Sequence, residues 1–242
     1  MKLKITILMF ALAIFGSAEA EARTQAACAV KGSRTVATDT GARVFRVSKE
    51  KRDPAYGRRV VLYFFYGCLY RTDRKYYLGA DECLSSFGKL GHMRLAGRYV
   101  AYATSVCSPD RDTRTAVSVT DLRTGRKRVF PEFLSPPPPS VPCLPTECPA
   151  LPSAPDTQVT ALTLTTNGSV AWITRKVGVY RPHSPTRLEP YVLYEVRKAD
   201  KSGADIVLDS GADVDPASLR LSTDGTIVYW TKRGVETSAP LQ

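Results

Sequence analysis

Apolar and polar residues alternate along most of the chain, as in Arg43-Val44-Phe45-Arg46-Val47 and Ala116-Val117-Ser118-Val119-Thr120. Successive side chains of a β-strand point to opposite faces, so a period of two predicts short strands. Val60 to Tyr70 is a longer run of apolar and aromatic residues. Gly, Asp, Thr and Pro separate these segments, and only the stretch around Ala80 to Leu84 has the spacing of a helical turn. The pattern therefore predicts an all-β chain.

Three stretches share one plan: Leu95 to Tyr102, Leu164 to Trp172 and Leu221 to Trp230. Each has a leucine, a turn that contains glycine, and an apolar strand that ends in an aromatic residue. Asn167-Gly168 and Asp224-Gly225 are hairpin signals because both residue types tolerate positive φ. The aromatic residues Tyr102, Trp172 and Trp230 recur in one register, which predicts core packing rather than platforms for sugar rings.

The strand that follows the first of these stretches ends in Asp121-Leu122-Arg123-Thr124-Gly125. Together with the turn Ser222-Thr223-Asp224-Gly225, this resembles the repeat of WD-repeat-like β-propellers of the TolB type, although the proline of that family's turn is missing. The resemblance implies about four blade-like antiparallel sheets in a small or incomplete β-propeller. An open, incomplete propeller and a β-sandwich remain as alternatives.

The repeat also implies approximate limits for the four sheets. They are Arg34 to Leu78, Met93 to Phe130, Thr160 to Leu208 and Ser218 to Leu241. The fourth is short by about one strand, and we expect the N-terminal segment to complete it and so close the ring by strand exchange between the two ends.

The first twenty residues have the order of a secretory signal peptide. Lys2 and Lys4 form a basic start, Ile5 to Phe15 is apolar, and Ala18-Glu19-Ala20 supplies small residues for cleavage. The apolar run is shorter than a membrane-spanning helix requires. We therefore expect residues 1–20 to be a signal peptide, residues 21–242 to form a single secreted or periplasmic domain, and the mature chain to have no transmembrane segment.

All six cysteines follow the expected cleavage point: Cys28, Cys68, Cys83, Cys107, Cys143 and Cys148. An even number in an exported chain predicts three disulfides, whereas zinc would require a different spacing. Cys143 and Cys148 are close enough in sequence for a local bridge. The propeller plan places Cys83 and Cys107 at the same end of neighbouring sheets. Cys28 is then left to form a bridge with Cys68, although Cys68 lies near the opposite end of its strand.

Ten of the 17 prolines lie between Pro131 and Pro155. Proline removes backbone donors, so this segment is predicted to be an extended insertion loop or spacer. The alternative is a docking peptide for an aromatic groove.

No catalytic constellation is evident in the sequence. His92 and His183 have no nucleophile motif beside them, and Asp110 and Asp112 are explained as turn residues. The densest acidic group is Asp205, Asp209, Asp213 and Asp215, which lacks the pattern of a calcium loop. We therefore predict a non-enzymatic binding or scaffold protein without a cofactor or metal.

The formal net charge is +11. It favours anionic neighbours, while basic residues that occur along the whole chain without local clusters argue against a nucleic-acid groove. The expected partner is an unidentified protein or an anionic surface polymer. The alternatives are an extracytoplasmic hydrolase or lyase that uses acidic residues on one propeller face, and electrostatic attachment alone.

Overall fold

The computed structural model describes residues 28–52, 57–81, 89–105, 115–131, 156–180 and 189–241. Their regular structure consists of strands, arranged in four antiparallel sheets. The predicted signal peptide and most of the proline-rich segment lie outside these residues, as does His183. So do Asp110, Asp112 and four of the six cysteines.

Each sheet is built from strands that are consecutive in the sequence. The first sheet contains β1 (Ser33–Thr38), β2 (Ala42–Arg52), β3 (Arg59–Leu69) and β4 (Lys75–Asp81), and the second contains β5 (Lys89–Ala96), β6 (Tyr99–Ser105), β7 (Thr115–Asp121) and β8 (Lys127–Pro131). The third contains β9 (Asp156–Leu164), β10 (Val170–Tyr180), β11 (Glu189–Ala199) and β12 (Asp205–Gly211), and the fourth contains β13 (Arg220–Leu221), β14 (Ile227–Lys232) and β15 (Val235–Pro240). The predicted division into four sheets is confirmed.

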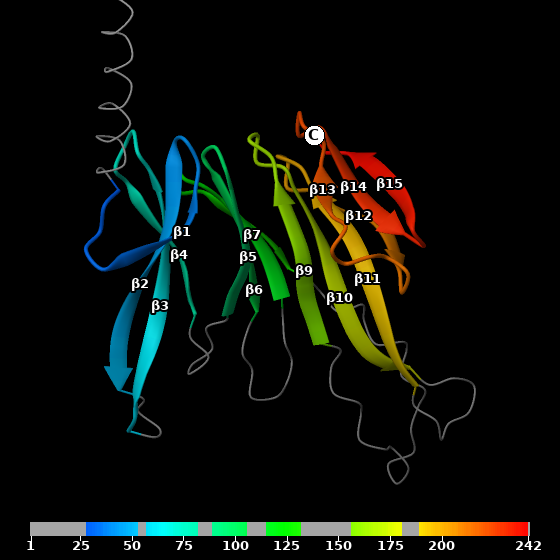
Figure 1. The fold of residues 1–242 in the computed structure, drawn as a ribbon, viewed down its shortest axis with the longest axis horizontal. Coiled ribbons are helices and arrows are strands. Elements are labelled where there is room, and N and C mark those ends of the chain that lie inside the picture. Colours follow the sequence, from blue (N-terminus) through cyan, green and yellow to red (C-terminus); the bar gives the residue numbers. More distant parts are fainter. Residues whose placement is uncertain are drawn as a thin grey trace, which may run out of the picture.

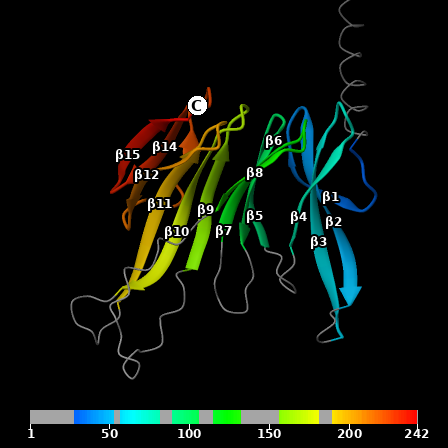
Figure 2. The same ribbon diagram turned by 180° about the vertical axis from the view of Figure 1, so that it is seen from behind.

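The four sheets stand in a row in chain order, with the first and the fourth at opposite ends (Figures 1 and 2). The N-terminal strand β1 pairs with β2 and not with the fourth sheet, which keeps three strands. The predicted closure of a ring by strand exchange is therefore wrong. The short turn from Asp39 to Ala42, closed by an N–H···O bond of 2.9 Å, lets β1 pair with its sequence neighbour, which requires far less loop closure than a partner at the other end of the chain.

Each sheet buries apolar side chains against the next. Val44 and Leu78 of the first sheet pack against Val100, Tyr102 and Leu122 of the second. The second and third sheets bury Val117, Phe130, Leu162 and Trp172 between them, and the third and fourth bury Ile173, Val196, Val228 and Trp230. The core is thus divided into three layers, one for each pair of neighbouring sheets.

The repeated aromatic residues occupy equivalent places in these layers. Tyr102, Trp172 and Trp230 lie on the second strand of their sheets and pack toward the preceding sheet. Their exposed fractions are 0%, 0% and 3%. The prediction that they are core residues is confirmed.

Short turns lie along one side of the molecule, at the top of Figure 1. Polar contacts at this side join each sheet to the next. The carboxylate of Asp39 accepts the backbone N–H of Gly97 at 2.7 Å, which joins the first sheet to the second. Arg128 donates to the carbonyl oxygen of Gly168 and so joins the second to the third. The ammonium of Lys198 donates to the carbonyl oxygen of Pro240 at 2.7 Å and joins the third to the fourth. We call this side of the molecule the turn end.

Candidate functional site

The acidic residues named as a possible enzyme site do not converge. Asp205 forms an ion pair with Arg197 at 2.7 Å, and Asp213 pairs with Arg233. Asp215 accepts the N–H of Ala217 within its own turn. Because these carboxylates are engaged by separate structural partners, the arrangement gives a hydrolase no pair of carboxylates acting on one bond.

Asp209 belongs to a structural contact between the third and fourth sheets. It accepts the indole N–H of Trp230 at 2.9 Å and pairs with the ammonium of Lys232 at 2.6 Å. Partial burial acts to raise the pKa of Asp209, but the hydrogen bonds from Lys232, Trp230 and the N–H of Ser210 outweigh it, and the pKa is lowered. A carboxyl held ionised in this way cannot donate a proton at neutral pH.

His92 lies in a β-bulge of β5, opposite β6, and has a φ of 46°. Partial loss of hydration around the imidazole, together with the positive charge of the nearby Arg94, lowers the pKa of His92. The neutral imidazole is exposed, and the described residues place no nucleophilic side chain in a hydrogen bond with it. His92 is thus without the geometry of a catalytic base.

A buried set of four charges crosses the third sheet. Lys176, only 6% exposed, pairs with Glu195 at 2.6 Å, and Arg197 pairs with both Glu195 and Asp205. Two cations face two anions, so the charges compensate each other inside the protein. The set is explained as a structural ion-pair network, which is costly to break by removing one member.

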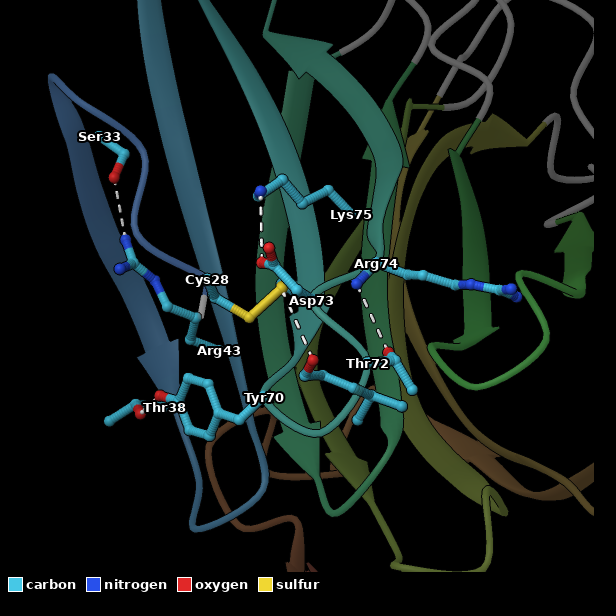
Figure 3. Close-up of a disulfide and its surroundings, with 11 residues drawn as sticks. Cys28, Ser33, Thr38, Arg43, Tyr70, Thr72, Asp73, Arg74 and Lys75 are labelled. Carbon is cyan, nitrogen blue, oxygen red and sulfur yellow. Dashed lines mark hydrogen bonds and ion pairs between the residues drawn. A yellow bond between two sulfur atoms is a disulfide. The ribbon is translucent and has the colours of Figure 1, made fainter. Parts of the chain in front are cut away.

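A disulfide joins Cys28 to Cys68 across 40 residues, with their Cα atoms 6.0 Å apart. Figure 3 shows the bridge beside the turn from Tyr70 to Lys75. The carboxylate of Asp73 lies within 4.8 Å of both sulfurs, so these three residues are near enough to hold a metal ion. Because the two sulfurs are bonded to each other, neither is a thiolate, and Asp73 instead forms an ion pair with Lys75 at 3.3 Å.

The disulfide holds the N-terminal segment, residues 28–30, over the outer face of the first sheet. Val30 and the bridge pack on Phe45, which is 1% exposed, and on Tyr70. Ser33 donates its N–H to the carbonyl oxygen of Val30 at 3.0 Å, so the chain turns back there before β1 begins. This reversal explains how Cys28 reaches Cys68 at the far end of its strand, which had argued against the pairing.

The other four cysteines, Cys83, Cys107, Cys143 and Cys148, lie outside the described residues, and their two bridges stay predictions.

Positive charge is divided unevenly along the row of sheets. Lysine and arginine outnumber aspartate and glutamate by 21 to 9 over residues 28–131, which contain the first two sheets, but are equal at ten each over residues 156–241. The excess of cations therefore lies in the first half of the chain, spread over the segments that form two sheets. A count of charge by segment rather than over the whole chain would have found the difference.

A hollow of about 450 Å³ opens at the β2–β3 hairpin, opposite the turn end of the first sheet. Its lining includes Lys51, Arg52 and Arg59, together with Glu50 and Gly57. The Arg59–Glu50 ion pair is 3.7 Å long and both side chains are more than half exposed. Such a pair gives the hollow little rigidity.

No protein-family model matches the chain, and the search of curated proteins also finds no match. The described residues include no helix with the length and apolar character needed to cross a bilayer.

Proposed function

We propose that this protein is an exported, non-enzymatic binding protein that attaches to an anionic polymer outside the cell. The observation that carries the proposal is the uneven charge: the excess of cations lies in the half of the chain that forms the first two sheets. A basic region of this extent attracts polyanions at long range and raises their rate of association.

The row of sheets suits a scaffold of the incomplete-propeller type, because the outer face of its first sheet is covered. The N-terminal segment covers Phe45 on the first sheet. Terminal repeats of stacked proteins commonly carry such covers, which keep the end faces from associating.

The hydrolase or lyase alternative has less support. Asp205, Asp209 and Asp213 each form an ion pair with a different cation, and Asp215 caps a turn. An acid–base pair would require two carboxyl groups that face one substrate bond.

The proposal is tested by measuring binding of the mature protein to immobilised polygalacturonate and to uncharged dextran. Binding to the acidic polymer alone is expected at an ionic strength of about 0.05 M, with a loss of most binding at about 0.5 M, where charges are screened beyond a few ångströms. Equal retention on both polymers contradicts the proposal. A fall in the chain length of polygalacturonate during incubation supports the enzyme instead.

A further inference from the structure

One sequence motif occurs at corresponding turns of the first two sheets. Arg71-Thr72-Asp73-Arg74-Lys75 connects β3 to β4, and Arg123-Thr124-Gly125-Arg126-Lys127 connects β7 to β8. Each is thus an Arg-Thr-Xaa-Arg-Lys sequence between the third and fourth strands of its sheet. The corresponding turn of the third sheet, Asp200-Lys201-Ser202-Gly203, has a different sequence.

The two turns also share a backbone conformation. Asp73 donates its N–H to the carbonyl oxygen of Leu69 at 3.0 Å, and Gly125 donates to that of Asp121 at 2.7 Å. Both residues have positive φ, 50° for Asp73 and 75° for Gly125.

In each turn the threonine hydroxyl accepts the N–H of the arginine two residues later, at 3.5 Å from Arg74 to Thr72 and 3.2 Å from Arg126 to Thr124. The two arginines of one motif therefore occupy the same turn positions as those of the other.

Tyr76 holds the two turns against each other. Its hydroxyl donates to the carbonyl oxygen of Arg123 at 3.3 Å. A Cβ atom at Gly125 would lie only 2.5 Å from the ring of Tyr76, so the close approach requires glycine there. The two arginine pairs consequently lie on one surface formed by neighbouring sheets.

The β3–β4 turn is further fixed at its base. Cys68 is bridged to Cys28, and the hydroxyl of Tyr70 lies 3.1 Å from that of Thr38 (Figure 3). In the same view Arg74 extends away from the disulfide. The arginines are thus attached to a rigid support, which lowers the entropy cost of ligand binding.

The nearby acidic groups are already engaged. Asp73 pairs with Lys75, and Asp121 pairs with Arg98 at 3.4 Å and accepts the N–H of Arg123 at 2.8 Å. Arg71, Arg74, Arg123 and Arg126 are exposed, and within the described part of the chain no ion pair joins them to a carboxylate. Four guanidinium groups are therefore available to a ligand in solvent. We call these four residues the arginine surface.

We propose that the arginine surface binds an acidic polysaccharide, an inference that rests on the proposed function and assigns its site. Guanidinium groups bind carboxylates and sulfates through paired hydrogen bonds, and two separated pairs match successive charged groups of one chain. A chain polymer, unlike a small anion, contacts both turns at once.

The experiment compares three variants of the full mature chain. The first changes Arg71, Arg74, Arg123 and Arg126 to glutamine. The second changes the same four residues to lysine, which keeps the charge but removes the planar fork. The third changes Lys51, Arg52, Arg58 and Arg59 to glutamine, which removes the same number of positive charges as the first variant but from the opposite end of the first sheet. Affinity for polygalacturonate and dextran sulfate is measured against salt concentration, with double-stranded DNA and anionic phospholipid vesicles as competitors.

We expect the first variant to lose at least about tenfold in affinity, which corresponds to about 1.4 kcal/mol. Its salt dependence should become shallower by roughly one unit for each lost contact. The affinity of the second variant, with lysines, is expected to lie between that of the first variant and that of the original protein. The third variant is expected to lose less than about threefold in affinity, because its substitutions remove only long-range attraction.

Equal losses in the first and third variants would overturn the arginine surface and leave the proposed function intact. Absence of binding by the original protein to either acidic polysaccharide would overturn both. Stronger binding to DNA or to vesicles than to the polysaccharides would overturn the assigned ligand class.

Discussion

Phe45 in the first sheet and Trp172 in the third occupy equivalent positions on the second strands of their sheets, but different parts of the protein cover their rings. Trp172 packs against Ala101 and Val117 of the preceding sheet. Within the described part of the chain no sheet precedes that of Phe45, and the Cys28–Cys68 bridge with Val30 packs on it instead. A disulfide-linked segment of a few residues thus takes the place that a whole sheet occupies elsewhere in the row.

Replacement of both Cys28 and Cys68 by serine is expected to destabilise the protein by about 3–4 kcal/mol, because the bridge closes a loop of 40 residues. The change also loosens the cover over Phe45. Urea unfolding gives the free energy, and binding of a hydrophobic dye reports exposure of Phe45. An unchanged urea midpoint would contradict the role of the segment as a cover.

For the whole set of six cysteines, mass analysis of the non-reduced mature protein is expected to show a loss of six hydrogens. Two or more free thiols would contradict the prediction of three disulfides.

Trp172 and Trp230 are both expected to be important for stability. Truncation of either to alanine should cost about 3–5 kcal/mol, since both are buried. Trp230→Phe additionally removes the hydrogen bond to Asp209, which costs about 1–2 kcal/mol beyond the change in volume. Thermal and urea unfolding measure these costs. A fully stable alanine variant that has lost ligand binding would identify the ring as a surface platform.

Asp39 makes the contact between the first two sheets sensitive to pH. Hydrogen bonds from the N–H groups of Gly97 and Thr40 lower the pKa of Asp39, against the opposing effect of burial. A carboxyl whose pKa is lower in the folded protein adds to the free energy of unfolding at any pH above its unfolded pKa of about 3.9. This contribution disappears as the pH falls through the pKa of the folded state. Asp39→Ala is therefore expected to be about 1 kcal/mol less stable than the original protein at pH 7, and the difference should shrink below pH 4.

Amide exchange at Gly97 provides the direct measurement for this prediction. Its N–H should exchange faster in the Asp39→Ala variant at pH 7, while Gly168 in the next interface keeps its rate. A difference in stability that is the same at low and neutral pH would contradict the ionic contribution.

The proline-rich segment is expected to be dispensable. β8 ends at Pro131 and β9 begins at Asp156, so residues 132–155, which lie outside the described residues, connect two neighbouring sheets. The free energy of loop closure depends on the logarithm of length, and a short linker in their place should change stability by about 1 kcal/mol. Thermal unfolding of the deletion variant measures this. A melting temperature lowered by tens of degrees would mean that the segment packs into the core.

Local patterns predicted the sheets well. The leucine, glycine turn and terminal aromatic residue of Leu164 to Trp172 determine a hairpin and the face that it buries, and these features depend only on neighbouring residues. Ring closure depends on whether the N-terminal strand pairs with its neighbour in the sequence or with the fourth sheet. The alternation of apolar and polar residues does not distinguish these two partners. The sequence therefore predicted the sheets and misassigned the N-terminal segment.

The arginine surface was harder to predict because its parts are distant in sequence. The β3–β4 and β7–β8 turns meet through the packing of Tyr76 against Arg123 and Gly125. The duplicated Arg-Thr-Xaa-Arg-Lys motif is visible in the sequence. The two copies lie on one surface, however, only because each forms the third turn of its sheet and the two sheets are neighbours. The network of Lys176 and Glu195 was missed for the same reason, since its members are on different strands.

Because the row of sheets is not closed into a ring, the protein could gain a further sheet during evolution with little rearrangement. In a closed ring, every sheet fixes the angle between its neighbours, and the insertion of one more sheet requires all the angles to adjust. Here the first and fourth sheets lie at opposite ends of the row (Figure 1). A gene duplication that adds a sheet next to the fourth would have to create only one new interface, and the bridge between Cys28 and Cys68 would stay in place at the other end.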